Sequence, residues 1–241
     1  DKDKDKDKDK DKDKDKDKKI KIVGLIPFWS DKKGGVDLQK IAGKYLIEHS
    51  VELLNSSSFV QETIIYSSND KVMGLINKDL SVKYLNRPGL LDKEDVSIEE
   101  IITQFMNDYD FDILVLVRPF CPFISRHTID ECINRVMTGR NDSAFTAIEF
   151  QKLSWFKGKP LNFNTSEPSL KKNNIDAVII EQGLTHILSK DSFVKNKSRV
   201  GVNPFIKIID LYEGHEVENN HDYEVAELIV NSGMYKGPYY E

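Results

Sequence analysis

A loop after the first apolar run of the chain carries the residues best suited to bind phosphate. Within the stretch Ile20 to Gly43, the apolar run is followed by two lysines and two glycines, at Lys32, Lys33, Gly34 and Gly35. Adjacent glycines let backbone N–H groups approach an anion closely, and lysine side chains add positive charge. The loop fits neither the P-loop pattern nor the dinucleotide-binding pattern, so an ordinary polar turn is the alternative interpretation.

Two glutamates near the carboxyl terminus have the spacing of a cation site. Glu216 and Glu218 are separated by one residue, and in an extended segment such residues point to the same side. Mg²⁺ is usually held by one or two carboxylates together with phosphate oxygens, so the pair is a candidate magnesium site. The alternative is a pair of solvated glutamates on an edge strand. His215 beside the pair is a candidate ligand or base, and a surface histidine is the simpler interpretation.

Two arginines lie just after predicted strands. Arg118 comes after the run Asp112 to Val117, so its charge should face the crevice at the end of a buried strand. A guanidinium group there can bind a carboxylate through two parallel hydrogen bonds. We therefore interpret Arg118 as a contact to a substrate carboxylate or to a phosphate. Arg87, which precedes Pro88, can equally belong to a simple turn.

These candidate residues need a sheet that brings strand ends together, and the hydrophobic pattern predicts one. We expect strands at Ile20–Leu25, Thr63–Tyr66, Val82–Leu85, Asp112–Val117, Ala144–Ile148, Ala177–Ile180, Thr185–Leu188 and Phe205–Ile209. The run at 112–117 is almost wholly apolar, as is typical of strands buried on both faces of a parallel sheet. Strands that alternate with helices predict a doubly wound, mainly parallel α/β sheet. Ligands bind at the carboxyl ends of such strands, so strands 20–25, 63–66 and 112–117 should line one crevice.

Capping residues and helical periodicity predict the helices between these strands. Ser97 and Glu100 form a capping box before apolar residues that recur at i, i+3, i+4 and i+7. Thr128 and Glu131 predict a second capped helix, in which Cys132 falls on the apolar face and is a core residue rather than a nucleophile. Further helices are expected at Tyr45–Leu54 and Asp222–Val230.

The segment Phe150 to Asn174 departs from this alternation. It contains Trp155-Phe156-Lys157-Gly158-Lys159-Pro160, which is typical of a hairpin-like turn. Two aromatic residues beside a tight turn would form an exposed apolar patch, so we expect the segment to leave the main sheet and to reach a second subunit. A flap over the chain's own site is the competing interpretation.

Composition limits the class of protein. The first 18 residues are nine Asp-Lys repeats, which have no apolar side chain to bury and are interpreted as a tag, a placeholder or a disordered tail. The repeat holds nine of the 35 basic and nine of the 40 acidic residues, so residues 19–241 keep the net charge of −5. A mildly acidic body argues against nucleic acid or an anionic membrane as the main partner. No apolar run approaches a membrane span, and the two cysteines suggest neither a disulfide framework nor a zinc site; we expect one α/β domain over 19–241 in the cytoplasm.

Six short motifs occur in an order and spacing that resemble the acylneuraminate cytidylyltransferases, the CMP-sialic acid synthetase family, whose fold is of the nucleotide-diphospho-sugar transferase type. The family motif I-P-A-R-G-G-S-K-G is similar to Ile26–Gly34, and V-S-T-D is similar to Tyr66–Asn69. R-P-A-E-L with D-T-A-S looks like Arg87–Leu91 with Glu94–Ser97, L-L-Q-P-T-S-P-L-R like Leu116–Ile124, N-G-A-I-Y like Gln182–His186, and I-D-I-D like His215–Glu218. The resemblance extends from Ile20 to about Val230.

The resemblance implies a nucleotidyltransferase that joins CMP from CTP to a 2-keto acid sugar or a related small acid and releases pyrophosphate. It implies Lys33 and Arg118 as catalytic residues and Mg²⁺ held by Glu216 and Glu218. The implied nucleotide-binding residues are Pro27, Phe28, Lys33, Gly34, Ser67, Arg87 and Ser97. The implied contacts to the acid substrate are Arg118 and Gln182. A homodimer, joined through the excursion at 150–174, is implied as well.

Three departures from the family pattern fall on this chemistry. Trp29 stands where the family has a loop arginine thought to meet the triphosphate, and Arg118 stands where it has a sugar-contacting glutamine. The loop from Gly34 to Gly43 is two residues shorter than in the family, and its Lys-Asn pair is not recognisable. A catalytically silent relative that binds a nucleotide or serves as a structural subunit is therefore the alternative function.

Overall fold

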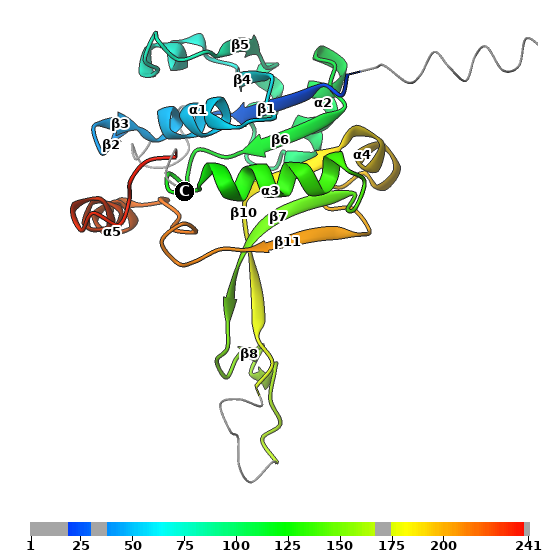
Figure 1. Cartoon of the computed structure of the whole chain (residues 1–241), viewed down its shortest axis with the longest axis vertical. Helices are drawn as coiled ribbons and strands as arrows, with labels where there is room; N and C mark the ends of the chain where they lie inside the picture. Colours follow the sequence, from blue (N-terminus) through cyan, green and yellow to red (C-terminus); the bar gives the residue numbers. More distant parts are fainter. Residues whose placement is uncertain (1–18, 30–37, 167–174, 239–241) are drawn as a thin grey trace, which may run out of the picture.

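One sheet organises the structure, a computed structural model that describes residues 19–29, 38–166 and 175–238 (Figure 1). Its seven strands have the order β11-β7-β10-β6-β1-β4-β5. They are β1 (Ile22–Pro27), β4 (Glu62–Ser67), β5 (Lys83–Asn86), β6 (Ile113–Val117), β7 (Ser143–Phe150), β10 (Val178–Ser189) and β11 (Pro204–Ile208). Only β10 runs antiparallel to its neighbours in this sheet. The doubly wound, mainly parallel α/β fold expected from the sequence is confirmed.

Helices cover both faces of the sheet and bury its apolar side chains. On one face, α1 (Leu46–Ser56) and α3 (Arg126–Met137) contribute residues such as Val51 and Ile133 to a core cluster with β1, β6 and β7. On the other face, α2 (Ile98–Asp108) and α4 (Lys190–Asn196) contribute Phe105 and Phe193 to a second cluster. Because both faces are covered, the central strands are apolar throughout, as the run at 112–117 predicted.

Helix capping was predicted correctly for α2 and wrongly for α3. Ser97 accepts a hydrogen bond from the Glu100 amide, and the Glu100 carboxylate accepts one from the Ser97 amide. The N-cap of α3 is Ser125, whose hydroxyl accepts a hydrogen bond from the amide of Thr128, so Thr128 lies in the first turn instead of at the cap. Serine and threonine are both good caps, and the three-residue offset between them is not decided by the sequence pattern.

The parallel register places the carboxyl ends of the central strands together. Pro27 at the end of β1 is opposite Tyr66 of β4, and Leu25 is opposite Leu116 of β6. The first strand begins and ends two residues later than predicted, which brings Phe28 and Trp29 to this edge. The three strands therefore end at one edge of the sheet, as the sequence predicted.

The described part of the excursion, residues 150–166, belongs to an arm built on the extended ends of β7 and β10, which projects away from the body of the molecule (Figure 1). The two strands predicted at 177–180 and 185–188 are one strand with an irregular register between Glu181 and His186. On the arm, β8 (Trp155–Phe156) and β9 (Lys159–Pro160) form a hairpin. Its turn residues Lys157 and Gly158 have φ of 50° and 76°, as a two-residue type I′ turn requires.

A small cluster joins the carboxyl-terminal helix to the body. The hairpin of β2 (Lys40–Ile41) and β3 (Lys44–Tyr45) packs with α5 (Asn220–Asn231), and Ile41, Phe123 and Val217 are buried between them. Two 3₁₀ helices, η2 (Asp70–Leu75) and η3 (Gly89–Asp92), follow β4 and β5. Within the described ranges no helix is long and apolar enough to cross a membrane.

Candidate nucleotide and acid site

A pocket of about 400 Å³ opens at the carboxyl edge of the sheet, between the ends of β1 and β6 and the start of α2. Trp29 follows β1, Arg118 follows β6, and Ser97 caps α2. The lining residues are Trp29, Glu94, Val96, Ser97, Ile98, Glu99, Arg118 and Arg199. The pocket therefore combines an aromatic ring, two guanidinium groups, two carboxylates and the amino-terminal end of a helix. The ring, the guanidinium groups and the helix end favour a ligand with a flat ring or a negative charge.

Arg118 is a partly buried cation whose side chain has unused hydrogen-bonding capacity. Its guanidinium carbon lies 5.5 Å from the centroid of the Phe120 ring. Among the described residues, its Nε has no hydrogen-bond partner, and no carboxylate lies within ion-pair distance of the group. Burial lowers the pKa of Arg118, Glu218 opposes that effect, and the neighbouring Arg199 adds to it. A carboxylate or phosphate entering the pocket would therefore meet a guanidinium group that makes no ion pair with the described residues.

The segment with the two glutamates lies directly beside Arg118. The amide of Val217 donates a hydrogen bond of 2.7 Å to the carbonyl of Phe120, and the thiol of Cys121 lies 3.4 Å from the carbonyl of His215. Val217 is fully buried, whereas Glu216 is partly and Glu218 largely exposed. Glu216 and Glu218 therefore flank a buried residue in a segment that is neither helix nor strand.

The carboxylates of this segment are ligands that hard divalent cations take. No group of three or more His, Cys, Asp or Glu side chains suited to hold a metal is found in the described parts of the chain. Two carboxylates match Mg²⁺, which commonly takes one or two protein carboxylates and completes its shell with water and phosphate. They do not match a metal enclosed by protein ligands alone.

Arg199 is held in the pocket wall by a network that the sequence did not reveal. Its Nη1 is 2.6 Å from a carboxylate oxygen of Glu99, and its Nη2 is 3.4 Å from one of Glu181. The same Glu181 oxygen is 2.8 Å from Nε2 of His186, a fully buried side chain. Burial lowers the pKa of His186, and the hydrogen bond with His186 lowers the pKa of Glu181. Nε of Arg199 is also 3.2 Å from His186 Nε2, so this nitrogen lies between a carboxylate oxygen and a guanidinium N–H.

Arg87 lies beneath Trp29 and outside the pocket lining. Its side chain is fully buried, donates to the backbone carbonyls of Tyr66 and Phe28, and forms an ion pair of 2.5 Å with Asp92. Its guanidinium carbon is 4.3 Å from the centroid of the Trp29 ring. The sequence predicted Arg87 as a nucleotide-binding residue. In the structure its side chain lies next to the pocket and is bonded to the protein itself.

The other predicted site residues are distributed around the same edge. Pro27 ends β1, and Phe28 is buried with its carbonyl directed at Arg87. Ser67 ends β4 and is buried, with its hydroxyl accepting from the Asn69 amide. Gln182 lies on β10 at the base of the arm, where its side-chain amide donates to the carbonyl of Gly214 at 2.9 Å. Lys33 and Gly34, together with Lys32 and Gly35, lie outside the described residues.

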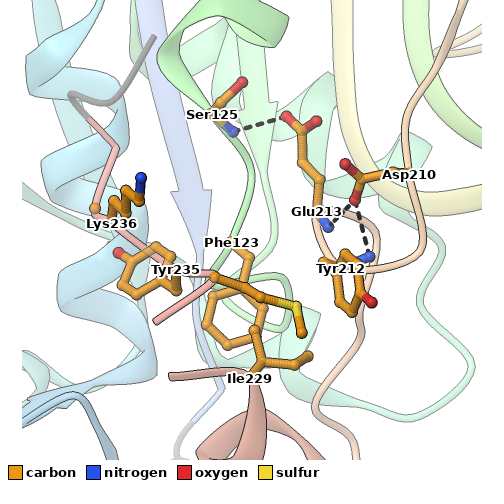
Figure 2. Close-up of a pocket in the computed structure, with 10 residues that line it drawn as sticks. Phe123, Ser125, Asp210, Tyr212, Glu213, Ile229, Tyr235 and Lys236 are labelled. Carbon is orange, nitrogen blue, oxygen red and sulfur yellow. Dashed lines mark hydrogen bonds between the residues drawn. The ribbon is translucent and has the colours of Figure 1, made fainter. Parts of the chain in front are cut away.

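A second pocket of about 240 Å³ lies near the carboxyl-terminal segment (Figure 2). Its carboxylates are occupied by backbone amides: Glu213 accepts from Ser125, and Asp210 accepts from Tyr212 and Glu213. The ring centroids of Phe123 and Tyr235, which both line this pocket, are 4.9 Å apart. These contacts fasten the carboxyl-terminal segment to the loop after β6, so we assign the ligand site to the pocket that holds Arg118.

Neither cysteine is suited to nucleophilic chemistry. Cys132 is fully buried on α3, and burial raises the pKa of its thiol to about 12. Cys121 is also buried, and burial raises its thiol pKa well above the ordinary value. Both thiols are therefore protonated at neutral pH, which agrees with the core position predicted for Cys132.

A doubly wound α/β domain with a pocket at its carboxyl edge, lined by two arginines and two glutamates, defines a class of proteins that bind small, often phosphorylated ligands at that edge. Residues 35–173, more than half of the chain, match the cytidylyltransferase family. The chain therefore belongs to the cytidylyltransferase family. No match is found among curated proteins.

Solved structures of cytidylyltransferases share the fold. A CMP:2-keto-3-deoxy-manno-octonic acid synthetase complexed with CTP superposes with a TM-score of 0.64 at 15% identity, covering 88% of this chain and 99% of its own. A 4-diphosphocytidyl-2C-methyl-D-erythritol synthase gives 0.61 at 12% identity with the same coverage. The same synthase from Anaerococcus prevotii DSM 20548 gives 0.58 at 12% identity, again covering 88% and 99%. At these identities the likeness concerns the fold.

Proposed function

We propose that this protein transfers CMP from CTP to an acidic acceptor, a 2-keto acid sugar or a related small acid, and releases pyrophosphate. The observation that carries the proposal is the partly buried Arg118 in a pocket at the carboxyl edge of a cytidylyltransferase fold. Arg118 makes no ion pair with the described residues, so an acceptor carboxylate, which can accept two parallel charge-assisted hydrogen bonds from a guanidinium group, is favoured over a neutral alcohol. The CMP-octonic acid synthetase among the structural neighbours acts on an acid of this kind, which supports the choice.

In the proposed reaction, a hydroxyl oxygen of the acceptor attacks the α-phosphorus of CTP and forms a new O–P bond. The bond between the α-phosphorus and the bridging oxygen breaks, pyrophosphate leaves, and the hydroxyl proton passes to solvent. Such phosphoryl chemistry depends on positioning and on neutralising negative charge more than on covalent catalysis. Arg118 would orient the acceptor by its carboxylate, and Lys33 would bind phosphate oxygens. Ser97 and Trp29 would enclose the nucleoside.

Glu216 and Glu218 are the residues that would hold Mg²⁺. When bound, the ion would neutralise phosphate charge. The carboxylates would also keep an electrostatic partner beside Arg118, because Glu216 and Glu218 both favour its charged form.

The experiment that tests the proposal is incubation of the full chain with CTP, Mg²⁺ and a panel of acidic sugars while pyrophosphate release is measured. Turnover with at least one acid, and none with the corresponding neutral sugars, is the expected result. Tight CTP binding without turnover across a broad panel would instead support a catalytically silent relative that binds a nucleotide. The sequence argument for this alternative is that Trp29 stands in place of the family's loop arginine. Failure to bind any nucleotide at millimolar concentration with Mg²⁺ would reject both and leave a structural subunit.

We further propose that the protein is a homodimer joined through the arm. Trp155 and Phe156 at the arm hairpin are 59% and 61% exposed, and Leu153 and Leu161 beside them are also exposed. Apolar groups gathered on a projecting hairpin are typical of a surface that another subunit covers. A second copy is the occupant that the resemblance favours, and a flap over the chain's own site is less compatible with an arm that projects from the body (Figure 1).

A further inference from the structure

We propose that Arg87 is a positioning residue that fixes the Trp29 ring as the aromatic wall of the site pocket, against which the base of the bound nucleotide stacks. This inference rests on the proposed function, because it requires a nucleotide in the pocket. It differs from the resemblance, which implies that the arginine at this position contacts the nucleotide itself.

The guanidinium group of Arg87 is hydrogen-bonded to other groups of the protein. Its side chain has no exposed surface, and its Nη1 and Nη2 donate to the carbonyls of Tyr66 and Phe28 at 3.2 and 3.0 Å. Its Nη2 also pairs with Asp92, which accepts a second hydrogen bond from Ser68. One guanidinium thus ties together the ends of β1 and β4 and the end of η3. A group so enclosed acts on a ligand through its neighbours.

Trp29 is the neighbour that reaches the ligand pocket. Arg87 lies under one face of the indole ring at 4.3 Å, and the indole N–H makes a long contact of 3.5 Å to the carbonyl of Leu91. A cation held against an aromatic face in a buried setting attracts it more strongly than at an exposed site. The ring is therefore fixed on one face and one edge, while it also lines the pocket with Arg118 and Ser97.

The stacking role follows from the chemistry of the pocket wall. Every nucleobase has a flat face that stacks on an aromatic ring, and such stacking strengthens binding without distinguishing the bases strongly. An indole held at a fixed angle loses little freedom when the base arrives, so Arg87 would contribute to nucleotide affinity although it does not touch the nucleotide. Removing Arg87 and removing Trp29 should then have the same consequence.

A double-mutant cycle tests this coupling. The reference protein is Trp155→Phe, which leaves Trp29 as the only tryptophan of the two in the chain. Calorimetry with CTP and Mg²⁺ compares Arg87→Met, Trp29→Ala and the double variant with this reference. Loss of a stacking ring weakens binding roughly 5- to 150-fold, so we expect Trp29→Ala to fall in that range and Arg87→Met to approach it. The double variant should bind no more than about twofold more weakly than Trp29→Ala. If the two losses multiply instead, Arg87 acts on the nucleotide directly and the inference is wrong.

A matched control removes a similar arginine–aromatic contact away from the pocket. Arg135 lies 4.5 Å from the centroid of the Phe205 ring, between α3 and β11. Arg135→Met should leave CTP affinity unchanged, and an effect equal to that of Arg87→Met would show that any such loss merely loosens the fold. Should Arg87→Met fail to fold by circular dichroism, Arg87→Lys, which keeps the charge but loses the planar fork, completes the same cycle.

Fluorescence of the ligand-free protein tests the positioning separately from the function. Arg87→Met should increase acrylamide quenching of Trp29 severalfold and lower its anisotropy, and unchanged quenching would overturn the positioning role. If the reference protein binds no nucleotide at millimolar concentration, the proposed function and the stacking are both rejected, while the quenching result still decides whether Arg87 fixes the ring.

Discussion

Replacement of Arg118 by glutamine separates acid recognition from nucleotide recognition. The substitution restores the residue type of the family that the sequence resembles, keeps a polar side chain and removes one positive charge. Hydrogen bonds to charged groups contribute about 1.5–3 kcal/mol, and each factor of ten corresponds to about 1.4 kcal/mol. We therefore expect the KM for the acid acceptor to rise about 10- to 150-fold, while the KM for CTP at saturating Mg²⁺ changes little.

The same substitution should not destabilise the protein. Arg118 is partly buried, and its Nε has no hydrogen-bond partner among the described residues, so its desolvation is poorly compensated in the absence of ligand. Removing the charge removes that cost and also removes the attraction to Glu216 and Glu218. These effects oppose each other, and we expect the free energy of unfolding to stay constant or to rise by up to about 1 kcal/mol.

Steady-state kinetics with an acid and with its neutral amide, together with urea denaturation, test both expectations. The amide should react equally poorly with the wild type and Arg118→Gln. Arg126→Gln is the matched control, because Arg126 lies on α3 with an i,i+4 contact of 3.7 Å to Asp130 and does not line the pocket. An unchanged KM for the acid, or an equal rise for acid and amide, would refute the assignment of Arg118 to the acceptor carboxylate.

Three further results are expected. Replacing Glu216 and Glu218 together by glutamine keeps size but removes charge, so calorimetry should show Mg²⁺-dependent CTP binding lost; unaltered binding would make the metal assignment wrong. Burial lowers the pKa values of His49 and His186 from 6.5, so the unfolded chain binds protons that the native state does not as pH falls below that value. The free energy of unfolding should therefore decrease from pH 7 toward pH 5, by at most about 1.4 kcal/mol per pH unit for each histidine, and His49→Gln should make this dependence shallower in urea titrations. Light scattering should show a dimer at micromolar concentration that Trp155→Ala weakens; a monomer unaffected by that substitution would contradict the arm contact.

Elements with a strong local signal could be predicted from the sequence. The apolar run before Arg118, the capping box at Ser97 and the Lys157-Gly158 turn each combine a local preference with a matching tertiary environment. The carboxyl-edge crevice followed from these strands, because parallel strands end at one edge. The cap of α3 was misplaced because Ser125 and Thr128 satisfy the same local rule, and only packing decides between them.

The contacts that complete the candidate site could not be predicted in the same way. Arg199 reaches the pocket from the loop after α4, far in sequence from Glu99, and no local pattern links the two residues. The stacking of Arg87 on Trp29 joins residues almost sixty positions apart and depends on a carbonyl of Phe28 that only the folded strand end presents. In the sequence, Trp29 is a departure from the family pattern and Arg87 is part of a family motif. Their contact, which only the folded structure shows, makes Arg87 a support for the Trp29 ring.

The two arginines of the pocket differ in their ion pairs with the protein, and this difference decides which of them gives specificity for an anion. Arg199 already meets carboxylates of Glu99 and Glu181, so an incoming acid would have to displace an existing ion pair to use it. Arg118 makes no such pair with the described residues and is partly withdrawn from solvent, so an acid offers it hydrogen bonds that the protein does not. Binding an acid at Arg118 therefore adds hydrogen bonds that the guanidinium group lacks, whereas binding at Arg199 exchanges one carboxylate for another. Arg118 should accordingly govern acceptor affinity, while Arg199 holds the wall against which the acceptor is placed.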